Sequence, residues 1–262
     1  MPSDPSPFSL RGNVVVQFGG TGLLGSALVR AIAAAGATLV VASRSRESME
    51  TIVAGMGEAG REVHVEEVDV ASENSIVEMR DRVLAAHGRI DGMVYNAVTR
   101  PMRSNDDPLS AWEESMVVNA TGAFAAMRAI GDSMARQGTG SIVGISSMYG
   151  MVGSNLFLYE GTPTTVPPDY FFHKAGMINL ARYLAAHYGR NGVRVNTVSP
   201  GGIFNPDKPQ APAFLERYNK LTSLGRMADA EDLGGPVVFL LGDASVYVTG
   251  TNLPVDGGYT AR

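Results

Sequence analysis

The chain alternates short apolar segments with longer helical segments along its whole length. The short segments, such as NVVVQF, TLVVA and SIVGIS, are continuously apolar, which is typical of parallel strands covered on both faces. The expected strands are 13–18, 38–42, 62–68, 91–95, 141–146, 193–198 and 252–255, and the expected helices are 22–35, 46–58, 72–87, 108–136, 170–188 and 231–241. Strand–helix repeats with right-handed crossovers predict an α/β fold, a doubly wound parallel sheet flanked by helices.

No linker, repeat or low-complexity tract divides the 262 residues, so residues 1–262 are expected to form a single domain. A formal net charge of -5 argues against a polyanion-binding surface, and we expect no nucleic acid partner. The chain has no cysteine, which excludes disulfides and thiolate chemistry. Its apolar stretches, such as 31–35 and 236–241, are far shorter than a membrane span, and the first ten residues do not resemble a signal peptide. These features predict a cytoplasmic protein with no membrane contact.

Glycine and proline punctuate 150–168 and 201–213 too densely for regular structure. Both segments follow expected strands, and ligands of open α/β sheets bind at the carboxyl ends of the strands. We therefore predict substrate loops at about 148–168 and 201–225. The alternative is surface decoration without a binding role.

A glycine-rich turn lies between the first expected strand and the first expected helix. Its sequence is Gly19-Gly20-Thr21-Gly22-Leu23-Leu24-Gly25. Glycine permits the tight turn and lets the backbone approach a pyrophosphate, to which the helix N-terminus offers free N–H groups. This position in a Rossmann-like sheet favours a dinucleotide site at Gly19, Thr21, Gly22, Leu23, Leu24 and Gly25. The alternative is a turn that needs glycine for its shape only.

The second expected strand ends at Ala42-Ser43-Arg44, without the carboxylate that a NAD site usually places there. The Arg44 guanidinium is suited to a 2′-phosphate, and the Ser43 hydroxyl can add a second contact. The sequence therefore favours NADP(H), with NAD(H) as the other option. In the alternative interpretation Arg44 only solvates a helix start.

Of the 9 tyrosines, Tyr170 alone has a lysine four residues on, Lys174. On a helix this spacing places both side chains on one face. A free tyrosine has a pKa near 10, and a nearby ammonium favours the phenolate, so such a pair suits general acid–base catalysis. From the spacing alone, a surface cation–aromatic pair is an equal alternative.

These residues resemble the short-chain dehydrogenase/reductase family. The resemblance runs from Val14 to Gly258. It comprises the glycine turn, Asp69-Val70, Asn96-Ala97, Asn119 within VNATG, Ser146-Ser147, Tyr170 with Lys174, Pro200-Gly201, and VDGG at 255–258. In this order and at these separations, the motifs are highly specific.

The resemblance implies a role for each matching position. Ser147 would hydrogen-bond the substrate oxygen, Tyr170 would move the proton at that oxygen, and Lys174 would hold the nicotinamide ribose. Asn119 would support a water-linked proton relay to Lys174. The cofactor would also meet Asp69, Val70, Asn96, Ala97, Tyr170, Pro200, Gly201 and Ile203. No metal is needed for this chemistry, and we interpret the 4 histidines as surface or packing residues.

The chain departs from the family pattern in four places. Phe18 replaces a threonine before the first glycine, and Leu23 stands where glycine is common, so the turn is G-x-x-G-x-x-G. Asn205 stands where a threonine often contacts the carboxamide. Ser147 and Tyr170 are 23 positions apart, a longer separation than the family usually has. We expect the added residues to form part of the substrate pocket.

The leading hypothesis is an NADP(H)-dependent oxidoreductase that interconverts a small secondary alcohol and a ketone by hydride transfer, with Tyr170 as general acid/base. One alternative is a sugar or nucleotide-sugar epimerase or dehydratase with a retained cofactor, and another is a non-catalytic dinucleotide-binding sensor. The resemblance also implies a homo-oligomer, a homotetramer or dimer. The helices near 108–136 and 170–188 are its expected contact faces.

Overall fold

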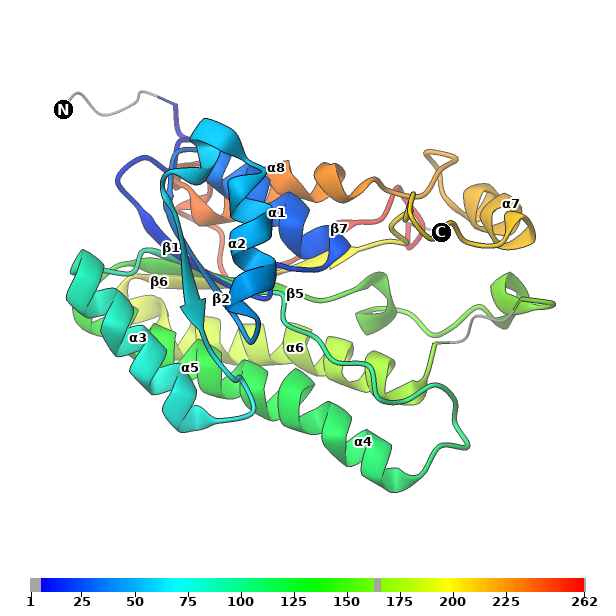
Figure 1. Ribbon diagram of the computed structural model, residues 1–262. Coiled ribbons are helices and arrows are strands. Elements are labelled where there is room, and N and C mark those ends of the chain that lie inside the picture. The colour runs from blue at the N-terminus through cyan, green and yellow to red at the C-terminus, as the bar shows by residue number, and fades with distance from the viewer. Residues whose placement is uncertain (1–5, 163–165, 262) are drawn as a thin grey trace.

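The computed structural model describes residues 6–162 and 166–261. Within them, seven strands form one parallel sheet in the order β3-β2-β1-β4-β5-β6-β7 (Figure 1). The strands are β1 Val14–Phe18, β2 Thr38–Ser43, β3 Val63–Glu67, β4 Gly92–Tyr95, β5 Gly140–Ile145, β6 Val193–Pro200 and β7 Asn252–Val255. The strand order changes direction between β1 and β4, where a doubly wound sheet leaves a crevice for a ligand. The expected Rossmann-like α/β fold is confirmed.

Helices cover both faces of the sheet (Figure 1). They are α1 Leu23–Ala34, α2 Arg46–Ala54, α3 Glu73–His87, α4 Leu109–Met116, α5 Ala123–Gln137, α6 Pro168–Tyr188, α7 Pro212–Leu221 and α8 Gly234–Leu241. Neighbouring residues of β1 belong to different cores: Val16 packs with α3, α5 and α6, and Val15 packs with α1 and α8. Burial on both faces explains why the strand segments are continuously apolar.

The helices begin at residues that suit helix starts. The Ser45 and Ser72 hydroxyls accept hydrogen bonds from the Ser48 and Ser75 amides and so cap α2 and α3. Pro168 is the first residue of α6, where its missing N–H is not needed. The start of α6 therefore sets the position of Tyr170 two residues later.

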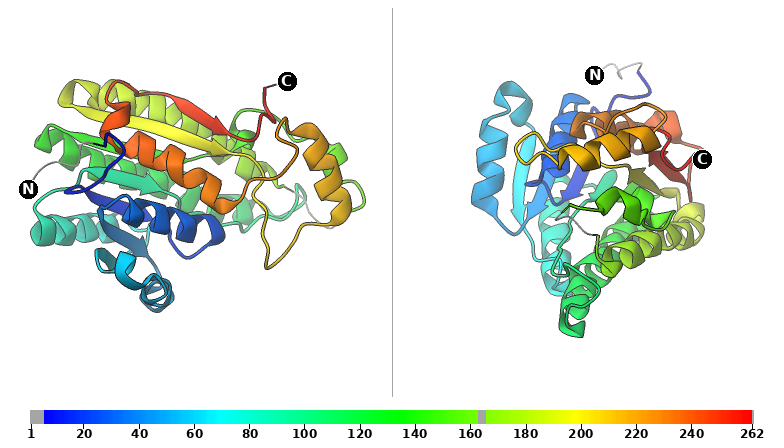
Figure 2. Two further views of the ribbon diagram at one scale, coloured as in Figure 1. Left: turned by 90° about the horizontal axis from the view of Figure 1, so that it is seen from above. Right: turned by 90° about the vertical axis from the view of Figure 1, so that its right-hand side faces the viewer.

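The two expected substrate loops contain short helices. The first has 3₁₀ turns at Met148–Gly150 and Leu156–Tyr159, while 163–165 lie outside the described residues. The second contains α7, which the turn-rich composition does not predict. α7 buries Phe214 and Tyr218, so packing rather than local composition accounts for it. Figure 2 shows α7 at the end of the molecule that lies beyond the carboxyl ends of the strands.

Within the described part of the chain, none of the helices is both long and apolar enough to cross a membrane. The same residues contain no cluster of three or more His, Cys, Asp or Glu side chains that could hold a metal ion.

Candidate active site

The glycine turn after β1 depends on close backbone contact. Gly19 has a φ of 82°, and a Cβ built on it would lie 2.8 Å from the Ala97 Cα. A Cβ on Gly25 would lie 2.8 Å from the Gly19 carbonyl oxygen. These two glycines are therefore required where the ends of β1 and β4 meet the start of α1.

Two amide side chains hold this turn in place. Asn96 Nδ2 donates to the Gly19 carbonyl at 3.0 Å. Gln17, fully buried in β1, donates from Nε2 to Gly19 O at 3.1 Å and to Gly25 O at 2.9 Å. Gln17 is a site residue that the sequence analysis missed, although a glutamine inside the apolar strand VVVQF is the signal that could have found it.

The start of α1 leaves room for an anion. Gly22 is the N-cap of α1, and no side chain makes a capping hydrogen bond there. A Cβ built on Gly22 would meet nothing within 4 Å. Thr21, Gly22 and Leu23 are exposed, while Leu24 is half-buried. An uncapped helix N-terminus with open space before it suits a pyrophosphate, so these residues fit a dinucleotide.

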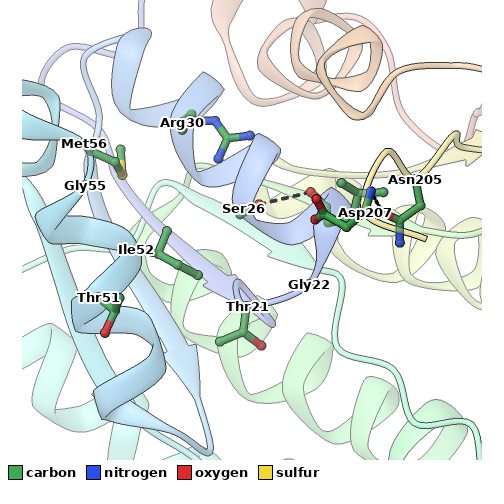
Figure 3. Close-up of a pocket in the computed structure, with 11 residues that line it drawn as sticks. Thr21, Gly22, Ser26, Arg30, Thr51, Ile52, Gly55, Met56, Asn205 and Asp207 are labelled. Carbon is green, nitrogen blue, oxygen red and sulfur yellow. Dashed lines mark hydrogen bonds between the residues drawn. The ribbon is translucent and has the colours of Figure 1, made fainter. Parts of the chain in front are cut away.

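A hollow of about 530 Å³ adjoins the turn between α1 and α2. Figure 3 shows α2 at one side of it, Asn205 and Asp207 from the segment after β6 at the other, and Thr21 and Gly22 between them. The Asn205 side chain accepts the Asp207 amide at 3.1 Å. The 201–211 segment thus reaches toward the glycine turn.

At the end of β2, the Ser43 hydroxyl accepts the Ser45 amide at 3.3 Å. Arg44 is exposed, and among the described residues it has no ion pair or hydrogen bond. Arg46, by contrast, pairs with Glu50 at 3.4 Å. The Arg44 guanidinium is therefore available at the end of β2 to bind an anionic group of a ligand.

The ends of β3 and β4 supply the next expected cofactor residues. Asp69 is exposed and its carboxylate accepts the Ala71 amide at 3.0 Å, while Val70 is buried. Ala97 is half-buried and lies against Gly19. The fold brings these residues to the same edge of the sheet as the glycine turn.

The expected helix 108–136 changes its winding in the middle, because Val117–Gly122 forms a π-helical turn between α4 and α5. Asn119 lies in this turn, 2% exposed. Its amide accepts the Thr99 N–H at 3.0 Å and donates to Thr99 O at 2.8 Å and to Ser115 Oγ at 2.9 Å. Asn119 therefore fastens the segment after β4, and π turns are frequent at functional sites.

Two serines at the end of β5 connect the sheet to α6. Ser146 Oγ donates to the Lys174 carbonyl at 2.8 Å. Ser147 is buried and its Oγ accepts the Tyr149 amide at 3.2 Å. A Cβ on Gly150 would lie 2.8 Å from the Lys174 carbonyl, so glycine permits this close approach to α6.

Tyr170 and Lys174 share one face of α6. Lys174 Nζ donates to the Ile145 carbonyl at 2.8 Å and lies 5.6 Å from the centroid of the Tyr170 ring. Burial, and then the charge of Arg100, lower the pKa of Lys174 to about 7. Lys174 is thus held between the end of β5 and Tyr170 by its own hydrogen bond.

The end of β6 completes this edge of the sheet. Gly201 follows buried Pro200, and a Cβ on it would lie 2.8 Å from the Tyr218 hydroxyl oxygen. Ile203 forms an isolated bridge with Ala228, and its carbonyl accepts Gln210 Nε2 at 2.9 Å. These contacts place the backbone around Ile203 beside α7.

Residues 22–260 match the family model described as enoyl-(acyl carrier protein) reductase. The chain is 33% identical over 259 residues to 2,5-dichloro-2,5-cyclohexadiene-1,4-diol dehydrogenase of Sphingobium indicum, with 96% of this chain and 98% of the relative covered. The chain is a member of the short-chain dehydrogenase/reductase family. It is an oxidoreductase of a family that uses NAD(P) cofactors.

Two further comparisons support this family. This short-chain dehydrogenase/reductase is 35% identical over 266 residues to NADP-dependent mannitol dehydrogenase of Hypocrea jecorina, covering 97% of this chain and 95% of the relative. Its fold matches a gluconate 5-dehydrogenase from Burkholderia cenocepacia, solved in complex with NADP and tartrate, with a TM-score of 0.87. That match has 27% identity and covers 98% of both chains.

An aromatic cap lies beyond the carboxyl ends of the strands of this oxidoreductase. We use that term for Tyr149, Tyr159, Phe214, Tyr218 and Tyr259. Tyr149 and Tyr159 are hydrogen-bonded through their hydroxyls, Tyr159 packs on Phe214 at 5.5 Å, and Tyr218 stacks on Tyr259 at 5.4 Å. The cap joins 148–162, α7 and the segment after β7, a contact that the sequence does not reveal.

Two polar groups of α6 are buried beside Tyr170: Asp169, which the sequence analysis does not name, and His173, which it expects at the surface or in packing. Asp169 is 2% exposed and accepts Ser115 Oγ at 2.5 Å. His173 is 4% exposed and packs edge-on against the Tyr170 ring at 5.3 Å, and among the described residues neither of its ring nitrogens has a hydrogen-bond partner. Burial, then the charges of Lys174 and Arg100, lower the pKa of His173 to about 3, so the ring stays neutral at physiological pH.

Proposed function

We propose that the chain interconverts a small secondary alcohol and a ketone with NADP(H), with Tyr170 as the general acid/base. The observation that carries this proposal is the arrangement at the end of β5. There Lys174 Nζ donates to the Ile145 carbonyl and lies near the Tyr170 ring, and Ser146, the neighbour of Ser147 in the chain, donates to the Lys174 carbonyl. The relatives reported above are dehydrogenases, which supports the same reaction class.

In this proposal the residues divide the work at one substrate oxygen. Ser147 Oγ donates a hydrogen bond to it, and Tyr170 Oη gives it a proton during reduction or removes one during oxidation. Lys174 provides charge beside the phenol, and Asn119 keeps the neighbouring segment in register through Thr99. A bound nicotinamide dinucleotide would supply or accept the hydride, held by the uncapped α1 start.

Tyr170→Phe tests the catalytic assignment. We expect kcat with NADPH and a ketone to fall about 10²–10⁴-fold, because the proton donor is lost while the ring is kept. Tyr183→Phe, on the exposed surface of the same helix, serves as the matched control and should keep full activity. Unchanged activity in Tyr170→Phe would remove the catalytic assignment, and unchanged biological function in a variant without turnover would favour the non-catalytic sensor. Turnover without net NADPH consumption would favour the epimerase or dehydratase.

The preference for NADP(H) rests on Arg44, which has no anion partner within the described ranges. A Ser43→Asp, Arg44→Ala double variant should shift the ratio of kcat/KM values toward NAD(H), because it replaces a phosphate-binding cation with a ribose-binding carboxylate. Steady-state kinetics with NADPH and with NADH provide the two kcat/KM values. An unchanged ratio would remove the assignment.

The proposal includes a homo-oligomer, a tetramer or dimer, formed through the faces of α4, α5 and α6. Those helices expose large apolar side chains, among them Leu109, Phe172 and Tyr183. Association through these helices would remove such apolar side chains from water, which is favourable. We also propose a cytoplasmic location, with a small carbonyl or alcohol substrate and no nucleic acid partner.

A further inference from the structure

The segment after β4 carries an arginine whose position is set by the proposed catalytic machinery. The Asn119 side chain makes two hydrogen bonds to the Thr99 backbone, and Arg100 is the next residue. The Arg100 guanidinium carbon lies 5.0 Å from the centroid of the Tyr170 ring. A cation is therefore held directly beside the phenol that would meet the substrate oxygen.

The charge of Arg100 is not neutralised by the chain. Across 6–162 and 166–261, Arg100 has no ion pair and no hydrogen bond, and the side chain is exposed. The nearby acid on α6, Asp169, is buried and accepts a hydrogen bond from Ser115. The backbone carbonyl of Glu160, which directly follows Tyr159, accepts a hydrogen bond from Arg217 rather than from Arg100.

The electrostatics of neighbouring groups agree with this placement. Arg100 is among the causes that lower the pKa of both Lys174 and His173, so its charge acts inside the site. No carboxylate contributes to the pKa change of either Lys174 or His173. The positive charge of Arg100 therefore acts on both groups without an offsetting carboxylate, although the chain as a whole carries a net charge of -5.

We propose that Arg100 binds a carboxylate on the substrate, so that the preferred substrates are secondary alcohols or ketones that carry a carboxylate near the reacting carbon. A guanidinium forms two parallel hydrogen bonds with a carboxylate, and a cation without a protein partner is free to do so. Stacking on Tyr170 orients the guanidinium and ties the position of the carboxylate to that of the phenol. This inference rests on the proposed function, because it names the substrate class of the same site.

The test compares substrates of equal shape and different charge. Reduction by NADPH is measured for 4-oxocyclohexanecarboxylate against 4-oxocyclohexanecarboxamide, and for levulinate against levulinamide. For the wild type we expect the higher kcat/KM with each acid. Arg100→Gln should lower kcat/KM for the acids about 10- to 100-fold and for the amides less than about threefold, with Arg100→Lys in between. Arg103→Gln, an exposed arginine on the same segment, is the control and should leave both values unchanged.

A binding measurement makes the test independent of turnover. Calorimetric titration of the NADP-loaded protein with cyclohexanecarboxylate should give a dissociation constant at least about tenfold lower than with cyclohexanecarboxamide, and Arg100→Gln should abolish the difference. Affinity for NADPH should not change in this variant. Equal losses for acids and amides, equal binding of both ring compounds, or weakened NADPH binding would overturn the inference. If the wild type still reduces neutral ketones, the proposed function stands although the inference about Arg100 fails. If the wild type reduces no ketone with either dinucleotide, the proposed function itself fails.

Discussion

Two glycines in the same turn serve different purposes, which single substitutions can separate. Gly19 is needed for the fold, because its φ is positive and the Ala97 backbone is 2.8 Å from a built Cβ. Gly22 has an extended backbone, with φ -81° and ψ 170°, and open space before it. We therefore expect the space beside Gly22 to serve a bound dinucleotide rather than the folding of the chain.

We expect Gly22→Ala to change the free energy of unfolding by no more than about 1 kcal/mol, since alanine is only a poorer N-cap. The added methyl group should nevertheless raise the dissociation constant for NADP(H) at least about tenfold, because it occupies the approach of the pyrophosphate. Gly19→Ala should lower stability by about 2–3 kcal/mol. Denaturant unfolding and dinucleotide titration measure both effects. Tight dinucleotide binding by Gly22→Ala would contradict the placement of the pyrophosphate.

His173 should make the protein sensitive to acid. The unfolded chain protonates this histidine near pH 6.5, whereas burial lowers its pKa to about 3 in the folded protein. Between these values the unfolded state holds more protons, so the contribution of His173 to stability is lost as the pH falls from 6.5 toward 3. We expect His173→Leu to lessen the loss of unfolding free energy between pH 7 and pH 5 by about 2 kcal/mol. Parallel pH profiles for the two proteins in urea unfolding would refute this expectation.

At the scale of elements, α7 is tied to the 3₁₀ turn Leu156–Tyr159 and its neighbours through one arginine. Arg217 donates to the Phe157 carbonyl at 3.1 Å and to the Glu160 carbonyl at 2.6 Å, and it lies over the Phe157 ring at 5.0 Å. The aromatic cap continues this contact inward through Phe214. The two elements therefore form one cover beyond the carboxyl ends of the strands, where we propose that the substrate binds.

Arg217→Gln should loosen this cover. We expect KM for the ketone to rise about 3- to 10-fold, because fewer contacts pre-order the pocket, while the unfolding free energy changes by less than about 1 kcal/mol at this half-buried position. Steady-state kinetics and thermal unfolding provide the readout. Lys220→Gln, which alters an exposed i,i+4 pair with Glu216 on the same helix, is the control and should leave KM unchanged. A KM that does not respond in Arg217→Gln would show that the cover does not order the pocket.

At the scale of the whole molecule, the proposed oligomer is the main expectation to check. Tyr183 on α6 is 62% exposed and stacks on His187 at 6.0 Å. If the α6 face is an interface, Tyr183→Glu should shift the protein to a smaller assembly, because burying an unpaired carboxylate is unfavourable. Sedimentation velocity would show the shift, and Tyr183→Phe should keep the wild-type mass. A wild-type protein that sediments as a monomer, or a Glu variant of unchanged mass, would rule out this face.

Much of the fold and part of the site were predictable from local patterns. Continuous apolar segments and capping residues are properties of neighbouring positions, so strands such as β1 and helices such as α3 lie within one or two residues of their expected bounds. The same holds for the shared helix face of Tyr170 and Lys174, because a four-residue spacing determines it. α7 and the π turn around Asn119 were not predicted, since tertiary packing outweighs weak local preferences there.

The sequence by itself therefore determined the alternation of elements, the sheet class, the glycine turn and the membership of the family. Only the tertiary structure decided which distant groups meet: Asn96 on Gly19, Asn119 on Thr99, Arg217 on the 148–162 segment, and Arg100 over Tyr170. The physical reason is that periodicity reports burial along one segment, whereas a contact between residues tens of positions apart depends on how the loops close and the helices pack.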